Sequence, residues 1–163
     1  MEATQRPEGL DHPLVPKLMR LMSRAHVWLY QRSGGRLGGT WRVGSAFRHG
    51  VPVLLLTTIG RKTGTPRTTP HLYLHDAEEG DRYLVVGSQG GLPKDPLWLS
   101  NLRANPDVEV QVGARRLPLR ARIADAEERS KLWPRLVALY ADFANYQAWT
   151  ERTIPVVILE PRR

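Results

Sequence analysis

Residues 53–70 read VLLLTTIGRKTGTPRTTP and decide the fold of this chain. An apolar run ends at Ile59, a short loop containing Gly60 and Gly64 follows, and an extended run then continues through residues 71–74. Apolar runs bounded by glycine and proline are typical of β-strands joined by a turn. The stretch therefore predicts a strand, a compact loop and a second strand.

The loop is strongly basic, because it contains Arg61 and Lys62 and is followed by Arg67. Its glycines allow the backbone amides to turn toward one point, so the loop suits a phosphate or a carboxylate. It is not a nucleotide-triphosphate loop: the second glycine comes one residue too early, and Thr65 and Pro66 follow it instead of Lys-Ser/Thr. Taken alone, the stretch also fits a turn whose cations are merely solvated.

The chain has 163 residues and no cysteine. This length fits one domain with a substantial core, and the lack of cysteine excludes disulfides, thiolate zinc sites and cysteine nucleophiles. No apolar run reaches the roughly 18 residues of a membrane span, and no signal-peptide core is present, so we expect a cytoplasmic protein. We expect no metal site, because His71 and His75, predicted to share a strand face, lack further ligands.

The positive charge is concentrated in the first half of the chain. The net charge is +8, yet residues 1–75 contain 11 Lys and Arg against 3 Asp and Glu, whereas residues 76–163 contain 13 of each kind. No acidic residue occurs between His12 and His75. Such a region implies an anionic partner, either nucleic acid, a membrane surface or an acidic small molecule. Nucleic acid fits least, because most aromatic residues lie outside the acid-free half.

The first 50 residues are expected to form a polar tail, a helix and a glycine-rich linker ahead of a barrel domain at 51–163. From residue 15 to about residue 32, apolar side chains recur with helical spacing and basic side chains fall mostly on other faces. This helix either packs on the domain or makes peripheral contact with an anionic membrane through residues 14–32. Residues 33–39, SGGRLGG, predict a flexible basic linker or lid.

The remaining chain predicts a small antiparallel barrel of about six strands with helices inserted between some of them. Pro96 opens a short helix, and Asp125 with Glu128 marks the start of a longer one that is kinked or interrupted around Pro134. Beyond the first hairpin, strands are expected at 82–87, 108–112, 116–123 and 155–159, and helices at 97–104 and from 125 toward Trp149.

Several motifs in this order resemble the deazaflavin-dependent nitroreductase family of mycobacteria and their relatives, within the superfamily of FMN-binding split β-barrels. The resemblance covers residues 53–161 and leaves the first 50 residues out. The motifs are the stretch 54–67, Ser88-Gln89-Gly90-Gly91, Pro96-Leu97-Trp98, residues 101–106, Glu128-Arg129, Trp133-Pro134, Tyr146-Gln147 and residues 150–155.

The resemblance implies a split β-barrel, mainly β with flanking helices, that binds the 8-hydroxy-5-deazaflavin coenzyme F(420). This coenzyme carries a phosphate and an oligoglutamate tail, so it is the kind of anionic ligand that the acid-free half already indicates. The basic loop would hold the phosphate end, and the Ser88–Gly91 turn would lie along the deazaflavin ring. The implied coenzyme-binding residues are Arg61, Lys62, Thr63, Arg67, Pro70, Ser88, Gln89, Gly90, Gly91, Trp98 and Asn101.

Two positions depart from the family. Gln89 stands where the family usually has lysine, which removes one cation but keeps a hydrogen-bonding group. Phe143 stands where members that activate nitroimidazoles have a tyrosine, while Tyr140 and Tyr146 are kept. For hydride transfer we expect Ser88 to contact the ring or the acceptor, and Tyr140 or Tyr146 to hydrogen-bond the acceptor oxygen.

The expected acceptor is a quinone, a nitroaromatic or an activated enone. Two alternatives come from the same fold. An FMN-dependent oxidoreductase is less favoured, because FMN has no oligoglutamate tail to explain the many cations. The second alternative is a non-catalytic protein that binds the deazaflavin or a lipid. The aromatic residues of the long helix also fit simple packing against the barrel. The oligomeric state does not follow from the sequence.

Overall fold

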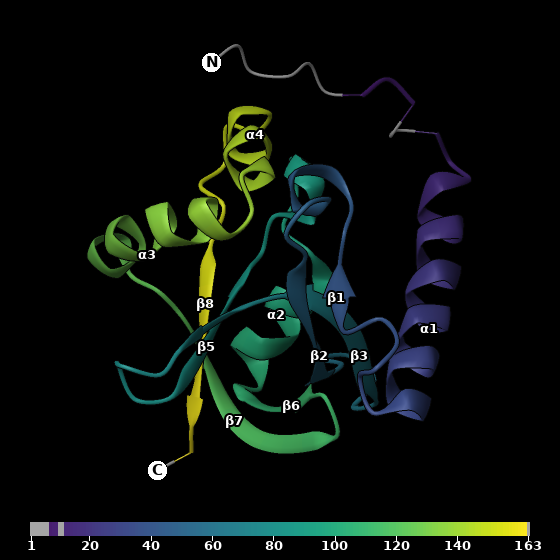
Figure 1. Ribbon diagram of the computed structural model, residues 1–163, viewed down its shortest axis with the longest axis vertical. Helices are drawn as coiled ribbons and strands as arrows, with labels where there is room; N and C mark the ends of the chain where they lie inside the picture. The colour runs from purple at the N-terminus through teal and green to yellow at the C-terminus, as the bar shows by residue number, and fades with distance from the viewer. Residues whose placement is uncertain (1–6, 10–11, 163) are drawn as a thin grey trace.

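The fold is a curled, antiparallel β-barrel with helices on its outside, as predicted (Figure 1). The computed structural model describes residues 7–9 and 12–162, so most of the polar tail expected at residues 1–11 lies outside the described residues. The strands pair in the order β1-β2-β6-β7-β8-β5-β4, with β3 on the other edge of β2. They are β1 (Thr40–Trp41), β2 (Val51–Ile59), β3 (Pro66–Leu72), β4 (Leu74–Asp76), β5 (Arg82–Val86), β6 (Asp107–Val112), β7 (Arg115–Ile123) and β8 (Val156–Pro161).

Strand β2 is the apolar run that opens the chain's decisive stretch, and it is buried on both faces. Leu54 and Leu56 point into a core shared with β6 and β7, whereas Val53 and Leu55 face helix α1. Burial on both sides explains why the sequence is continuously apolar here rather than alternating. The predicted hairpin is confirmed, with Val53 opposite Leu72 and Ile59 opposite Pro66.

The second strand of that hairpin breaks at Tyr73, which the sequence did not reveal. β3 pairs with β2, whereas β4 pairs with β5, so the chain changes partner strand at this residue. The Tyr73 ring packs edge-on to Tyr83 at 5.6 Å between ring centres. The break separates His71, which lies against Trp98, from His75, which stacks on Tyr83. The expectation that both histidines share one strand face is therefore wrong.

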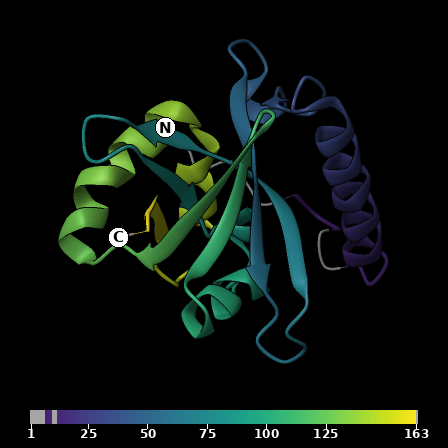
Figure 2. The ribbon, with the colours of Figure 1, turned by 90° about the horizontal axis from the view of Figure 1, so that it is seen from below.

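Four α-helices surround the sheet, with α1 on one side of the barrel and α3 and α4 on the opposite side (Figures 1 and 2). They are α1 (Val15–Ser33), α2 (Leu97–Ala104), α3 (Ala126–Leu139) and α4 (Asp142–Ala148), and short 3-10 turns form η1 (Gly44–Ala46) and η2 (Gln89–Gly91). Among the described residues, no helix is both long enough and apolar enough to cross a membrane.

Helix α3 begins with the capping box that the sequence predicted. The Asp125 carboxylate accepts from the Glu128 amide at 2.8 Å, and Glu128 accepts from the Asp125 amide at 3.1 Å. Of the two outcomes predicted at Pro134, a kink or an interruption, the interruption does not occur, because α3 continues through Pro134 to Leu139. The break falls at Tyr140, whose backbone is extended and whose ring enters the core with 4% of its surface exposed. Burial of this ring redirects the chain into α4.

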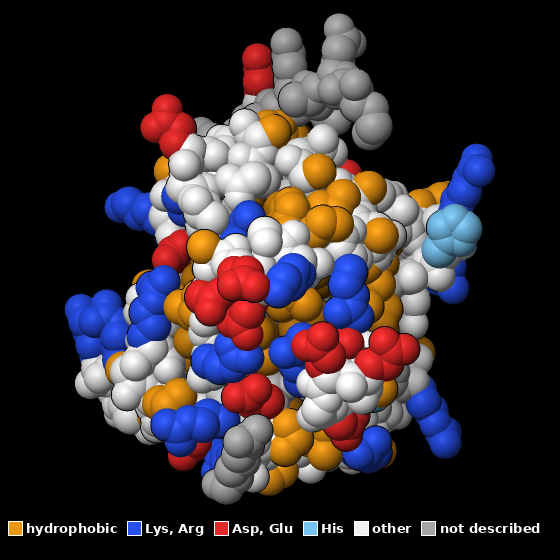
Figure 3. Space-filling model, turned by 90° about the vertical axis from the view of Figure 1, so that its left-hand side faces the viewer, with side chains coloured by type: hydrophobic (Ala, Val, Ile, Leu, Met, Phe, Trp, Pro, Cys, Tyr) orange, Lys and Arg blue, Asp and Glu red, His pale blue; other side chains and the backbone are white. Residues whose placement is uncertain are grey.

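Strands β5 and β8 divide their residues between two cores. Leu84 and Ile158 pack under α3 and α4, whereas Val85 and Leu159 pack under α2. Because successive strand residues point to opposite faces, one pair of strands forms the common wall of both cores. The surface on the α3 side mixes acidic with basic side chains, in contrast to the acid-free first half of the chain (Figure 3).

Helix α1 joins the barrel through Tyr30, which is 1% exposed. Its hydroxyl donates to the Val53 carbonyl at 3.0 Å and accepts from the Gly113 amide at 2.8 Å. Residues 33–39, expected to form a flexible linker or lid, fold into a turn against the β6–β7 hairpin. A Cβ on Gly35 would lie 2.7 Å from the Gly113 Cα atom, so only glycine allows this approach.

Candidate active site

A cavity of about 650 Å³ lies between β3, the η2 turn, α2, α1 and the junction of α3 with α4. Its walls bring together site residues that were predicted from the sequence. The two that are farthest apart in the chain, Pro70 and Tyr146, are separated by 76 positions. The predicted residues that line it are Pro70, Ser88, Gln89, Gly90, Trp98, Tyr140 and Tyr146, and Phe143 lies beside them. The others, Arg61, Lys62, Thr63, Arg67, Gly91 and Asn101, lie outside this lining.

The basic loop lies at the far end of β3 from the cavity. The Gly60 amide donates to the Thr65 carbonyl at 2.9 Å and the Gly64 amide to the Gly60 carbonyl at 2.7 Å, which closes a tight turn. Gly64 has φ +67°, and a side chain added there would meet open space. The hydroxyl of Thr63 bonds Thr65 at 2.8 Å within the loop. The backbone therefore presents an ordered surface to solvent.

The loop cations Arg61 and Lys62, and Arg67 directly after the loop at the start of β3, are exposed and unpaired among the described residues. Arg61, Lys62 and Arg67 make no side-chain hydrogen bond or ion pair with any residue in the described part of the chain. Asn101 of α2 supports the loop from below, because it accepts from the Arg61 amide at 3.2 Å and donates to the buried Thr58 hydroxyl at 3.2 Å. A fixed loop with free cations can bind an anion without first breaking ion pairs.

The Ser88–Gly91 turn has three residues with positive φ in succession, Gln89 at +46°, Gly90 at +62° and Gly91 at +76°. A Cβ on Gly90 would meet nothing within 4 Å, whereas one on Gly91 would lie 2.8 Å from the Tyr146 carbonyl oxygen. Ser88 is 8% exposed, and its hydroxyl has no hydrogen-bond partner among the described residues. The turn therefore offers the cavity backbone that is open at Gly90 and one free hydroxyl.

Arg152 fixes this turn from behind. Its guanidinium donates to the carbonyls of Gly87 at 3.1 Å, Ser88 at 2.8 Å and Leu92 at 2.9 Å, and pairs with Asp95 at 2.8 Å. The sequence placed Arg152 in a family motif without giving it a role. No local pattern could have assigned that role, because the partners of its guanidinium lie 57 to 65 positions away.

An aromatic wall closes the opposite side of the cavity. The hydroxyls of Tyr140 and Tyr146 lie 3.3 Å apart, and the Phe143 ring meets Tyr140 edge-on at 5.1 Å. Burial, together with the Tyr146 hydroxyl, raises the pKa of Tyr140 well above its usual value. Tyr140 therefore stays protonated at neutral pH, and either of the two hydroxyls can donate to the other.

Comparison with known proteins agrees with this geometry. A family model described as "F420H(2)-dependent quinone reductase" matches residues 22–161. The chain belongs to this family. A putative F420H(2)-dependent quinone reductase of Mycobacterium tuberculosis is 47% identical over 121 residues, which are 74% of this chain and 99% of that protein. An F420H(2)-dependent quinone reductase of the same organism is 42% identical over 142 residues, covering 85% and 89% of the two chains.

Two solved structures support the family fold. An F420-H2 dependent reductase, FDR-A, is 42% identical, has a TM-score of 0.61, and covers 67% of this chain and 94% of its own. A domain-swapped dimer is 32% identical, has a TM-score of 0.63, and covers 89% and 98% of the two chains. The predicted split barrel and family are thus confirmed. The family match begins at residue 22, within α1, so it extends beyond the region where the motifs were found.

The quinone reductase family depends on reduced coenzyme F(420), and the residues present here fit that group. Three features support this fit: the open space at Gly90, the unpartnered Ser88 hydroxyl, and the unpaired cations at the end of β3 that is far from the cavity. Open backbone at Gly90 leaves room for a ring to approach the turn, and the cations suit an anionic tail. The cations lie at the start of β3, and the end of β3 lines the cavity together with the turn, which follows β5.

The sequence did not predict that helix α1 forms one wall of the cavity. Met19, Met22, Ser23 and His26 of α1 close it on the outside, together with Trp41 of β1. His26 Nε2 bonds the Gly38 carbonyl at 2.7 Å, which ties α1 to the glycine-rich turn. Helical periodicity identified α1 as amphipathic, but it could not show which face lies over the cavity.

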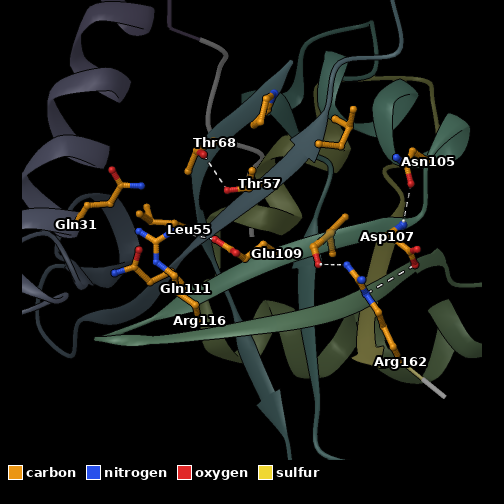
Figure 4. A pocket seen from close by; sticks show the side chains of 13 residues that line it. Gln31, Leu55, Thr57, Thr68, Asn105, Asp107, Glu109, Gln111, Arg116 and Arg162 are labelled. Atoms are coloured by element: carbon orange, nitrogen blue, oxygen red, sulfur yellow. Dashed lines mark hydrogen bonds and ion pairs between the residues drawn. The ribbon is translucent and has the colours of Figure 1, made fainter. Parts of the chain in front are cut away.

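A second groove, of about 530 Å³, lies on the outer face of the sheet (Figure 4). Its acidic residues are already neutralised: Glu109 pairs with Arg116 at 3.2 Å, and Asp107 lies 3.8 Å from Arg162. None of the predicted site residues lines it. This groove therefore lacks the free charge that distinguishes the basic loop of the quinone reductase site.

Proposed function

We propose that this chain transfers a hydride from reduced coenzyme F(420) to a small acceptor, with quinones favoured over nitroaromatics and activated enones. One observation carries the proposal: a cavity suited to a planar ring and a loop of unpaired cations lie at the two ends of β3. The resulting site matches a ligand with a ring at one end and an anionic tail at the other.

The coenzyme supplies the hydride when it is bound. The chain's task is to hold the ring beside the acceptor and to keep water away. Ser88 is assigned to the ring or the acceptor, because its hydroxyl is free at the cavity wall. Tyr140 and Tyr146 are assigned to the acceptor oxygen, since Tyr140 remains protonated and the two hydroxyls can pass a hydrogen bond along. The apolar side chains of Phe143 and Met22 exclude water.

The proposal also assigns the coenzyme's anionic end to the basic loop, with Arg61, Lys62 and Arg67 as its cations. Thr63 and Asn101 keep the loop in shape, since their side chains bond within it or beneath it. Pro70, Gly91 and Trp98 complete the ring site. FMN would leave the cations without a long tail to bind, and a non-catalytic binder would not require paired tyrosine hydroxyls at the cavity wall.

Replacing Lys62 or Arg67 with alanine is expected to weaken coenzyme binding by about tenfold each, because each removes a cation from an anion site. The loss should be larger for long-tailed than for short-tailed coenzyme, and should shrink in high salt. Fluorescence titration of the purified protein measures both effects. Lys131→Ala is the control, because this lysine on α3 pairs only with Glu127 at the surface. Equal affinity in all three variants would contradict the assignment of the loop.

We further propose that α1 makes peripheral contact with an anionic membrane on the cytoplasmic side. Its outer face exposes Leu14, Leu18, Leu21 and Trp28, each by more than half of its surface. Lys17, Arg20 and Arg24 flank this face, and no acidic residue follows until after His75. An apolar stripe with basic flanks is typical of helices that lie in a lipid interface.

The double variant Leu18→Ser/Leu21→Ser is expected to lose at least about tenfold in binding to vesicles with anionic lipid, because both side chains would leave the lipid interface. Neutral vesicles should bind the unchanged protein weakly. Co-sedimentation measures the effect, and Leu97→Ser is the control, because Leu97 is 73% exposed on α2. If the unchanged protein ignores vesicles but forms a dimer that the double variant loses, the face belongs to a second copy instead.

A further inference from the structure

His71 is a polar side chain inside the cavity that neither the motifs nor the proposed mechanism uses. It belongs to β3, the edge strand that lines the cavity, and its imidazole meets the Trp98 ring edge-on at 4.7 Å between centroids. Its Nε2 atom lies 2.8 Å from the Thr69 hydroxyl. The imidazole is thus held in one orientation by a hydroxyl on one side and an aromatic ring on the other.

The second ring nitrogen of His71, Nδ1, is not used in this contact. It has no hydrogen-bond partner in the part of the chain that the structure describes. Nδ1 is also not fully buried. Among the described residues, the one fully buried side-chain nitrogen or oxygen atom without a hydrogen-bond partner is Nε1 of Trp41, so the unpartnered Nδ1 keeps some accessible surface. Since His71 lines the cavity, Nδ1 is a free polar atom available to a ligand there.

The position of His71 along β3 matches the ring end of the coenzyme. Arg67, Thr69 and His71 alternate on one face of the strand, and four strand residues span about 13 Å. A ligand whose anionic end lies at Arg67 therefore reaches His71 with its ring system. Ser88 and Trp98, which border the same part of the cavity, lie at this end as well.

The chemistry of the pair suits a ring edge that presents N–H and C=O groups side by side. A neutral imidazole has one donor and one acceptor nitrogen, and a hydroxyl such as that of Thr69 can donate or accept. The pair can therefore offer either an N–H or a lone pair at Nδ1. Burial lowers the pKa of His71 to about 4, so the imidazole is neutral at physiological pH.

We propose that His71 is a coenzyme-binding residue whose Nδ1 hydrogen-bonds the polar edge of the deazaflavin ring, with Thr69 as the residue that orients it. The inference rests on the proposed function, since it assigns a contact in the same site. It adds a specific hydrogen bond at the ring end, where the loop cations cannot reach.

The test is fluorescence titration of coenzyme F(420) at pH 7 into the unchanged protein and three variants. His71→Leu keeps the contact with Trp98 but loses the hydrogen bond, and should weaken binding about five- to tenfold. His71→Gln keeps a hydrogen-bonding group and should stay within about threefold of the unchanged protein. Thr69→Val removes only the orienting hydroxyl and should weaken binding about two- to fivefold. The His71→Leu loss should be the same for short and long tails, unlike that of Lys62→Ala.

A second measurement does not depend on the variants folding. Side-chain ¹⁵N shifts of His71 in the unchanged protein report which nitrogen carries the proton, and they should change when the oxidised coenzyme is added. Unchanged shifts, equal affinity of His71→Leu, or a loss confined to the KM of the acceptor would each overturn the inference while leaving the proposed function intact. Failure of the unchanged protein to bind the coenzyme would overturn both.

Discussion

Replacing Arg152 with leucine is expected to lower the free energy of unfolding by about 2–4 kcal/mol and to weaken coenzyme binding by more than tenfold. The guanidinium serves three carbonyls and Asp95, and its side chain is only 15% exposed. Leucine would leave these acceptors unpaired and release the Ser88–Gly91 turn. Urea denaturation and coenzyme titration measure the two effects.

Arg103→Leu is the matched control for this experiment. Arg103 also pairs with Asp95, at 3.2 Å, but its side chain is 49% exposed. Its removal should cost less than about 1 kcal/mol and leave binding unchanged. If both variants behave alike, Asp95 alone accounts for the effect, and the carbonyl contacts of Arg152 do not fix the turn.

The Asp76→Asn variant is expected to lose about 2–4 kcal/mol of unfolding free energy at neutral pH. Asp76 is 2% exposed and accepts from Arg135 at 2.9 Å and from Arg82 at 3.0 Å, so it joins β4 and β5 to α3. An amide cannot balance two guanidinium groups. Because α3 leads into Tyr140, the loss should also loosen the aromatic wall of the cavity.

This effect should depend on pH. The hydrogen bond from Arg135, followed by that from Arg82, lowers the pKa of Asp76 below its usual 3.8. The unfolded chain therefore binds the proton first, so the stabilisation is complete above about pH 3.8 and is lost as the pH falls below it. Urea denaturation at a series of pH values should show the difference in unfolding free energy between the unchanged protein and Asp76→Asn shrinking as the solution is acidified. Glu79→Gln is the control, because Glu79 pairs with Arg82 at the surface.

Local sequence patterns were sufficient to predict much of the fold. Glycine and proline around residues 60–66 predicted the first hairpin, and Asp125 with Glu128 predicted the start of α3 to the residue. The predictions failed where contacts between residues far apart in the sequence determine the structure. Residues 71–74 read as one extended run, yet β4 leaves for β5 at Tyr73, and nothing within the run signals that change of partner.

The site was predictable to the extent that its residues are contiguous in sequence. The basic loop, the Ser88–Gly91 turn and the tyrosines stand in motifs, and the structure lines the cavity with the turn and the tyrosines. His71 and Arg152 could not be assigned, because their roles arise from partners on other elements. The roles of the motif residues in binding and catalysis stay predictions until the titrations are done.

The shared wall formed by β5 and β8 limits how the chain length can vary. Adding or deleting one residue within either strand would exchange the side chains that face the two cores. One core carries Tyr140 and Phe143, and the other supports α2 with Trp98. A single insertion would therefore displace both sides of the cavity together, whereas the exposed turn at residues 77–81 can change length freely.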